Sequence, residues 1–330
     1  MTDMQTASAP PPLPRLVRVD IARGMALVGV MIFHLCWDLR YFEFVLWPMD
    51  TAWGWIGFQK LLVGSFVGLS GLSLYLAHGR RVRWRAFWRR WLVLAGAALL
   101  ITGATWFTFQ PAFVYFGILH ALALFALLGL AALLLPAELW IPIGIFMLVV
   151  GIAHHDPAFN EKPLSWLGFW VVPPYTNDLV PVFPWFGIFL MGMGFGRTLT
   201  QPQPGALIAG PADWGWFGRA LKWIGRHSLI LYLVHQPLLL GVLVPLETIL
   251  QPQTWHRAER FVSECEASCG LGAADPGYCR RYCACSLEQI ESGQMWDTVS
   301  APAPAPTAAQ RRDIDEMIGL CVAMGQAGDR

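Results

Sequence analysis

Long apolar runs separated by short polar segments make up the chain from about residue 19 to about residue 250. A helix needs about 20 mainly apolar residues to cross the hydrocarbon of a bilayer, so each long run predicts a membrane span. The expected helices cover roughly residues 19–38, 54–77, 91–109, 113–135, 138–153, 181–197 and 227–250. The apolar piece 164–172 is too short to cross and predicts an interfacial or re-entrant segment. The pattern therefore predicts an all-α, polytopic bundle of about seven transmembrane helices.

Composition agrees with a bilayer environment. Hydrophobic residues make up 55% of the 330 positions and charged residues only 14%, whereas a soluble domain carries roughly 25% charged residues. The net charge of +1 argues against a nucleic-acid partner. Membrane lipid is therefore the expected surrounding of most of the chain.

Arginine positions orient the predicted bundle. Residues 80–90 contain six arginines and no acidic residue, and the segments 15–23 and 197–226 are basic as well. Such segments stay on the cytoplasmic side of a membrane. All three share that side only if residues 164–172 do not cross. The N-terminus is then inside, the C-terminus is outside, and a multi-pass protein of the bacterial inner (plasma) membrane is expected.

Changes in composition predict three parts of the chain. Residues 1–15 are polar and rich in Pro and Ala, which is typical of a disordered, here cytoplasmic, N-terminal segment. A transmembrane domain is expected over residues 16–252. The remaining residues, 253–330, form a Cys-rich tail outside the membrane, periplasmic on this topology.

An ionisable pair lies at the end of the first predicted span. His34 and Asp38 are four residues apart, so both project from one side of a helix. Neutral imidazole acts as a general base or as an acyl carrier, and a carboxylate can fix its tautomer. His34 is therefore a candidate catalytic base or carrier, and Asp38 either orients it or faces water. The alternative is a histidine that only anchors the helix end at the interface.

Further polar residues interrupt later spans. His120 lies in the outer half of the fourth predicted helix, where it could act as a base, polarise a carbonyl group or tie helices together. His235 and Gln236 fall near the middle of the last predicted helix and could line a polar pathway. Intramembrane groups of this kind are costly, which makes them functional candidates.

Several short motifs occur in a fixed order between residues 18 and 237. They are Arg18-x-Asp20-x-x-Arg23-Gly24, His34-x-x-x-Asp38-Leu39, Gly68-Leu69-Ser70-Gly71-Leu72-Ser73-Leu74, Gly117-Ile118-Leu119-His120, Pro184-Trp185-Phe186-Gly187 and Gly225-Arg226-His227-Ser228-Leu229-x-x-Tyr232-Leu233-x-His235-Gln236-Pro237. Through them the chain resembles bacterial members of the heparan-α-glucosaminide N-acetyltransferase-like family, part of a wider superfamily of transmembrane acyltransferases. The Cys-rich tail has no counterpart in that resemblance.

The resemblance implies an integral membrane enzyme that takes an acyl group from cytoplasmic acetyl-CoA, or another acyl-CoA, and gives it to an acceptor across the bilayer. In the lysosomal relative that acceptor is a terminal glucosamine of heparan sulfate. For a bacterial chain we expect O- or N-acylation of a periplasmic or envelope glycan instead. No metal is expected.

Basic residues on the inner face suit the phosphates of coenzyme A, because a guanidinium group pairs with phosphate through two hydrogen bonds. The positive-inside rule explains the same residues without a ligand, and we prefer that interpretation for the arginines of residues 80–90. The candidates for donor binding are Asp20, Arg23, Arg197, Arg226 and His227.

The tail carries six of the seven cysteines. Cys265-x3-Cys269 and Cys279-x3-Cys283 place two cysteines one turn apart on each of two helices that a Gly- and Pro-containing turn would join. Pairs Cys265–Cys283 and Cys269–Cys279 would close such a hairpin, and Cys285 and Cys321 could close a third bridge. An oxidising periplasm favours disulfides, whereas a cytoplasmic tail would favour zinc. Six cysteines allow 15 connectivities, so this pairing is a hypothesis.

Two other classes of function fit the same sequence. A small-solute transporter or channel would use His235 and Gln236 in its pathway and would not consume CoA. A membrane scaffold would present the tail to a periplasmic partner without any catalysis. The acceptor, the acyl chain length and a homo-oligomeric state are not specified by the sequence.

Overall fold

The computed structural model describes residues 17–200, 214–271, 275–299 and 307–326, and these residues contain α-helices and no β-strand. The chain divides into two compact units, one made of Met1–Trp37 and Pro48–Leu240 and the other of Asp38–Trp47 and Gly241–Arg330. The predicted disordered segment 1–15 lies outside the described residues, as does the Pro-rich stretch 301–306.

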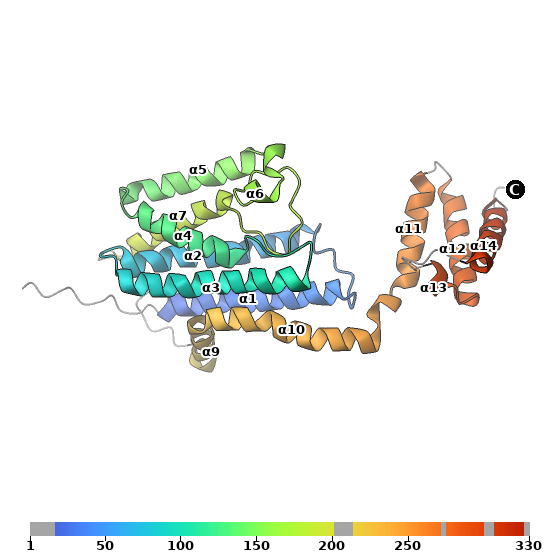
Figure 1. The fold of residues 1–330 in the computed structure, drawn as a ribbon, viewed down its shortest axis with the longest axis horizontal. Helices are drawn as coiled ribbons and strands as arrows, with labels where there is room; N and C mark the ends of the chain where they lie inside the picture. The colour runs from blue at the N-terminus through green and yellow to red at the C-terminus, as the bar shows by residue number, and fades with distance from the viewer. Residues whose placement is uncertain (1–16, 201–213, 272–274, 300–306, 327–330) are drawn as a thin grey trace, which may run out of the picture. The chain divides into compact units, whose positions relative to one another are not determined.

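The first unit is a bundle whose helices mostly run alongside one another, while α9 crosses their direction (Figure 1). The first and last of these helices, α1 and α10, continue into the second unit. The helices are α1 (Val17–Tyr41), α2 (Trp53–His78), α3 (Trp84–Thr108), α4 (Ile118–Ala132), α5 (Trp140–Ala153), α6 (Lys162–Ser165), α7 (Val182–Leu199), α9 (Gly215–Arg226) and α10 (Ser228–Leu250), with 3₁₀ turns η1 (Ala137–Leu139) and η2 (Pro157–Phe159).

Five of these helices, α1, α2, α3, α7 and α10, are long and apolar enough to cross a membrane, and α4 and the segment Ala137–Ala153 are shorter apolar helices. The protein is therefore a multi-pass membrane protein with an all-α fold, as the hydropathy pattern predicts. The orientation and the seven-span topology stay predictions.

Close helix contacts organise the centre of this bundle. Phe125 of α4 and Phe189 and Met193 of α7 are fully buried. Helices α2 and α7 approach so closely that a Cβ atom at Gly71 would lie 2.0 Å from the carbonyl oxygen of Phe189. Small residues allow such backbone approach in membranes, where packing rather than water drives helix association.

Three predicted boundaries differ from the structure. Helix α3 begins at Trp84 instead of residue 91, so the second half of the arginine segment is helical. Helix α4 begins at Ile118 instead of residue 113, because Gly117 is extended and the carboxylate of Asp178 accepts a hydrogen bond from the Ile118 N–H at 2.8 Å. Helix α9 is the third difference, because it lies between the predicted helices 181–197 and 227–250, where the sequence analysis expects no helix. The segment 164–172 is mostly non-helical, and its Trp166 carbonyl oxygen accepts a hydrogen bond from Val182 at the start of α7.

The second unit is a disulfide-bonded helical domain. It contains η3 (Pro252–Thr254), α11 (Arg257–Leu271), α12 (Pro276–Ser292), α13 (Trp296–Val299) and α14 (Ala308–Gln326). Disulfides join Cys265 to Cys283, Cys269 to Cys279 and Cys285 to Cys321, so the predicted hairpin pairing is confirmed and these six sulfurs offer no thiolate to zinc. Within this unit Arg260 also forms an ion pair with Glu43.

Candidate functional site

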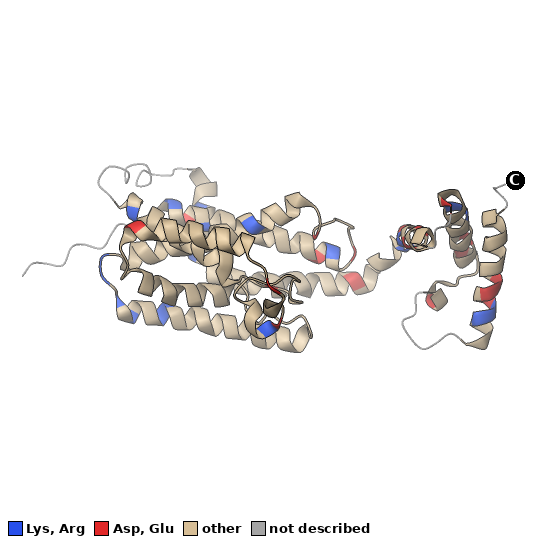
Figure 2. Ribbon diagram, turned by 90° about the horizontal axis from the view of Figure 1, so that it is seen from above, with Lys and Arg blue, Asp and Glu red and all other residues tan. Residues whose placement is uncertain are grey.

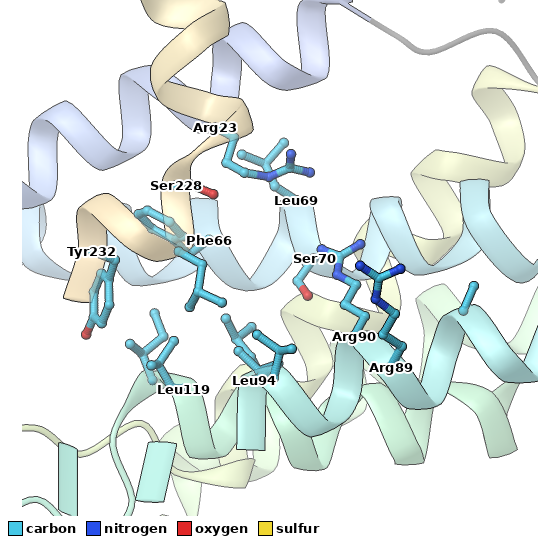
Figure 3. A pocket seen from close by; sticks show the side chains of 15 residues that line it. Arg23, Phe66, Leu69, Ser70, Arg89, Arg90, Leu94, Leu119, Ser228 and Tyr232 are labelled. Carbon is cyan, nitrogen blue, oxygen red and sulfur yellow. The ribbon is translucent and has the colours of Figure 1, made fainter. Parts of the chain in front are cut away.

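The first unit contains a pocket of about 490 Å³ between α1, α2, α3, α4 and α10. Most of its wall is aliphatic or aromatic. Figure 3 shows Arg89 and Arg90 on one side of the pocket and Tyr232 on the other. The polar lining residues are Arg23, Ser70, Arg89, Arg90, Ser228 and Tyr232. The pocket thus combines three guanidinium groups with a long apolar wall.

A buried carboxylate holds the arginine of α1. Asp20, with only 5% of its surface exposed, accepts a hydrogen bond from Nη1 of Arg23 at 3.3 Å and one from Nε of Arg226 at 3.4 Å. Nη2 of Arg23 donates to the Ser73 hydroxyl at 2.8 Å. A buried charge needs such partners. Asp20 therefore positions two arginines, one of which lines the pocket.

Two glycines bring Arg226 to this carboxylate. A Cβ atom at Gly225 would lie 1.8 Å from the Asp20 carbonyl oxygen, and one at Gly24 would lie 2.1 Å from the Leu221 carbonyl oxygen. Helix α9 can dock on α1 at this distance only because neither position has a side chain. The motif pairs Arg23-Gly24 and Gly225-Arg226 are therefore parts of one contact between α1 and α9.

Arg89 and Arg90 are pocket residues that the sequence interpretation assigned to a basic loop. Both residues lie inside α3. The neighbouring Trp91 holds this helix in one orientation about its axis, because its indole N–H donates to the Ala123 carbonyl oxygen of α4 at 2.9 Å. Figure 2 shows basic positions gathered where α1 and α3 begin. A signal was available, because Arg90 continues the i, i+4 series of Leu94 and Ala98 on the packed side of the helix.

Two of the predicted donor-binding residues lie elsewhere. Arg197 of α7 forms an exposed ion pair with Glu138 of η1, Nη1 to Oε1 at 2.8 Å. His227 directly follows α9; its Nδ1–H donates to the Trp223 carbonyl oxygen at 2.9 Å and its ring packs on the Trp223 ring. Neither residue lines the pocket.

Two histidines continue from Tyr232 in a row of neighbouring rings, first His235 and then His34. The ring centres of His235 and Tyr232 are 5.4 Å apart, and those of His235 and His34 are 5.1 Å apart. Nδ1 of His235 lies 2.6 Å from the Tyr232 carbonyl oxygen, which can only accept, so the proton sits on Nδ1. The Nε2 atom of His235 is buried and has no hydrogen-bond partner among the described residues. This nitrogen therefore presents an unused lone pair.

The expected partner of His34, Asp38, is buried one helical turn farther along and belongs to the second unit. The ring contacts that the structure gives His34 are with Phe33 and His235. Gln236, adjacent to His235, is half-buried on α10. The structure therefore pairs His34 with a residue of α10 that the sequence places about 200 positions away.

His120 belongs to a separate hydrogen-bonded group. Its Nε2 lies 3.0 Å from the Thr102 hydroxyl, which itself donates to the Val114 carbonyl oxygen at 2.8 Å. A hydroxyl has one proton, so Nε2 of His120 must be the donor to Thr102. His120 thus ties α3 to the start of α4, which agrees with the structural alternative for this residue.

Asp178 completes the support of α4. Burial raises the pKa of its carboxyl group from 3.8 to about 6, against the hydrogen bond from Ile118, which lowers it. The described residues contain no group of three or more His, Cys, Asp or Glu side chains that could hold a metal ion.

One of the comparisons with known proteins identifies a family. The family model described as heparan-alpha-glucosaminide N-acetyltransferase, catalytic, matches residues 15–237. No curated protein and no solved structure matches the chain. The match includes every residue that lines the pocket and ends within α10, before the Cys-rich tail.

Proposed function

The chain belongs to the heparan-alpha-glucosaminide N-acetyltransferase catalytic family, and on that premise we propose that it moves an acetyl or other short acyl group from acyl-CoA to a periplasmic or envelope glycan. The membership supports a membrane acyltransferase. The observation that carries the finer proposal is the pocket, in which three arginines face a long apolar wall.

The pocket suits the donor by its chemistry. The phosphates of CoA would pair with Arg23, Arg89 and Arg90, because guanidinium groups bind phosphate oxygens through two hydrogen bonds. The narrow pantetheine arm, which has amide groups but no charge, would lie along the apolar wall towards Tyr232. Asp20 would not touch the donor and would hold Arg23 in place.

The positive-inside rule alone is a weaker explanation of these arginines. That rule accounts for basic residues at one membrane face, but it does not require arginines of α1 and α3 to line one pocket. Arg23 also has a buried carboxylate partner, Asp20. The fact that arginines from two helices line the same cavity supports the binding of an anion there.

Of the two histidines His34 and His235, which lie in line with Tyr232, His34 would be the catalytic base. In direct transfer, His34 would take the proton of the acceptor hydroxyl or amine while the acceptor attacks the thioester carbonyl. The C–S bond then breaks, and the CoA thiolate leaves and takes up a proton. In a two-step route, the imidazole would carry the acyl group first. The lone pair on Nε2 of His235 can accept an N–H of His34 and so orient it in either route, in place of Asp38.

The proposal is tested by acyl transfer in proteoliposomes. Acetyl-CoA and a panel of glycans with free amino and hydroxyl groups are supplied, and released CoA thiol and labelled glycan are both measured. His34→Ala should lower the rate by roughly 10²- to 10⁴-fold, the usual contribution of a general base. His235→Ala should lower the rate as well, but less, because His235 only orients His34.

Arg197→Gln is the matched control, because this arginine pairs with Glu138 outside the pocket, and the rate of the variant should stay within about twofold of wild type. Solute flux without release of CoA thiol would point to a transporter instead. Full activity of both histidine variants would contradict the assignment of the base.

A further inference from the structure

Helix α9 has an unusual place in the first unit. It precedes α10 directly, and the last span before it is α7, so candidate membrane spans flank it on both sides. Figure 1 shows α9 crossing the direction of the bundle helices. Because the spans run through the membrane, a helix that crosses their direction at one end lies parallel to the membrane surface.

The sides of α9 differ sharply. Gly218, Leu221 and Gly225 are buried against the bundle. A second side carries the cations Arg219, Lys222 and Arg226, which are spaced i, i+3 and i+7 and so share one face.

The remaining surface of α9 is aromatic. Trp216, Trp223 and Phe217 have 74%, 56% and 51% of their surfaces exposed. The helix contains no Asp or Glu. Large aromatic rings beside cations are typical of helices that lie at a membrane interface, with indole rings at headgroup level.

Arg219 and Lys222 are available for a ligand. Among the described residues neither forms an ion pair, whereas Arg226 is already held by Asp20. We propose that α9 is an interfacial helix that binds anionic phospholipid headgroups through Arg219 and Lys222, with Trp216 and Trp223 inserted beside them. Charge complementarity and the aromatic side together identify the occupant as anionic lipid of the leaflet that covers this end of the bundle.

General attraction of basic loops to an anionic leaflet is the competing explanation. It would act equally on the exposed Arg80 and Arg81 between α2 and α3. Those two arginines therefore provide a control with the same loss of charge.

The experiment measures equilibrium binding of radiolabelled phosphatidylglycerol to the detergent-purified full chain, with unlabelled phosphatidylglycerol and phosphatidylcholine as competitors. Phosphatidylglycerol should compete saturably and phosphatidylcholine should not. The double variant R219Q/K222Q should bind about 25-fold more weakly, since each basic side chain near the surface contributes roughly fivefold. The double variant R80Q/R81Q should stay within about twofold of wild type.

A second variant, W216S/W223S, removes the aromatic side without changing charge, and it should weaken binding as well. Equal competition by phosphatidylcholine would overturn the proposal. So would equal weakening by R80Q/R81Q, or wild-type binding by R219Q/K222Q. Displacement by soluble glycerophosphoglycerol at millimolar concentration would also overturn it, because the site would then bind a free anion and not a membrane lipid. None of these outcomes depends on acyl transfer.

Discussion

The membrane bundle and the Cys-rich tail hold their helices together by different means. In the bundle, large side chains such as Phe125 and Phe189 fill the centre, and glycines let backbones touch. In the tail, α11 has no buried residue, and four half-cystines are among the few buried groups of α12 and α14. A small domain that cannot bury enough apolar surface needs covalent links. Lipid-facing helices can rely on packing alone.

Reduction of the three disulfides should give the largest difference in stability between the two units. Loss of a native disulfide from a small domain costs about 2–5 kcal/mol, so reductant should unfold the tail and leave the bundle folded. Hydrogen exchange with mass spectrometry checks this, by comparing peptides from α11, α12 and α14 with peptides from α4 and α7. Protection of the reduced tail equal to that of the oxidised tail would show that its packing suffices.

Gly71→Ala should destabilise the bundle by about 1–3 kcal/mol or more, because the added methyl group would meet the Phe189 carbonyl oxygen and force α2 away from α7. Thermal unfolding in detergent measures the effect. Gly96→Ala in α3 is the matched control, since a Cβ atom there has no neighbour within 4 Å. Equal melting temperatures for the two variants would contradict close packing of α2 on α7.

Two aspartates cap helices in the two units, and burial should distinguish them. Asp178 is half-buried and accepts from Ile118, whereas Asp275 at the start of α12 accepts from the Tyr278 N–H at 3.0 Å and is exposed. The pKa of Asp178 is raised to about 6, so the stability it contributes is complete below its unfolded pKa of 3.8 and is lost as pH rises through about 6.

Acidification from pH 7 to pH 5 should therefore stabilise wild type relative to Asp178→Asn by about 1 kcal/mol. The amide oxygen of the variant can still accept from Ile118, which keeps the cap. Melting temperatures at both pH values test this, with Asp275→Asn as the exposed counterpart. A pH response that Asp178→Asn shares with wild type would contradict the half-buried, titrating cap.

The smallest expected effect lies in the tail and has the opposite sign to that of Gly71→Ala. Gly319 is inside α14, and a Cβ atom added there would have no neighbour within 4 Å. Gly319→Ala should stabilise the tail by about 0.5–1 kcal/mol, because alanine loses less conformational entropy in a helix. Denaturant unfolding followed by tail-specific hydrogen exchange measures it, and a loss of stability would reveal a contact of α14 that the structure does not contain.

Local sequence patterns predicted the elements that depend on local rules. Apolar length predicted the bundle helices, and the i, i+4 cysteines predicted the hairpin pairing. Patterns missed what depends on distant contacts. His34 meets His235 only because α1 packs near α10, and no periodicity within α1 could show that. Arg89 and Arg90 look like loop residues in the sequence because the run of charges obscures their helical register. Helix α9 was missed for the same reason.

The central claim is that the arginine-lined pocket binds the CoA donor, and ligand-dependent thermal stability tests it without knowledge of the acceptor. Acetyl-CoA and CoA, but not adenosine, should stabilise the detergent-purified protein saturably, by roughly 2.7 kcal/mol at a hundred times the dissociation constant. R89Q/R90Q should abolish the shift, and R80Q/R81Q should keep it. No shift at millimolar acetyl-CoA in folded protein, or a full shift in R89Q/R90Q, would contradict the account.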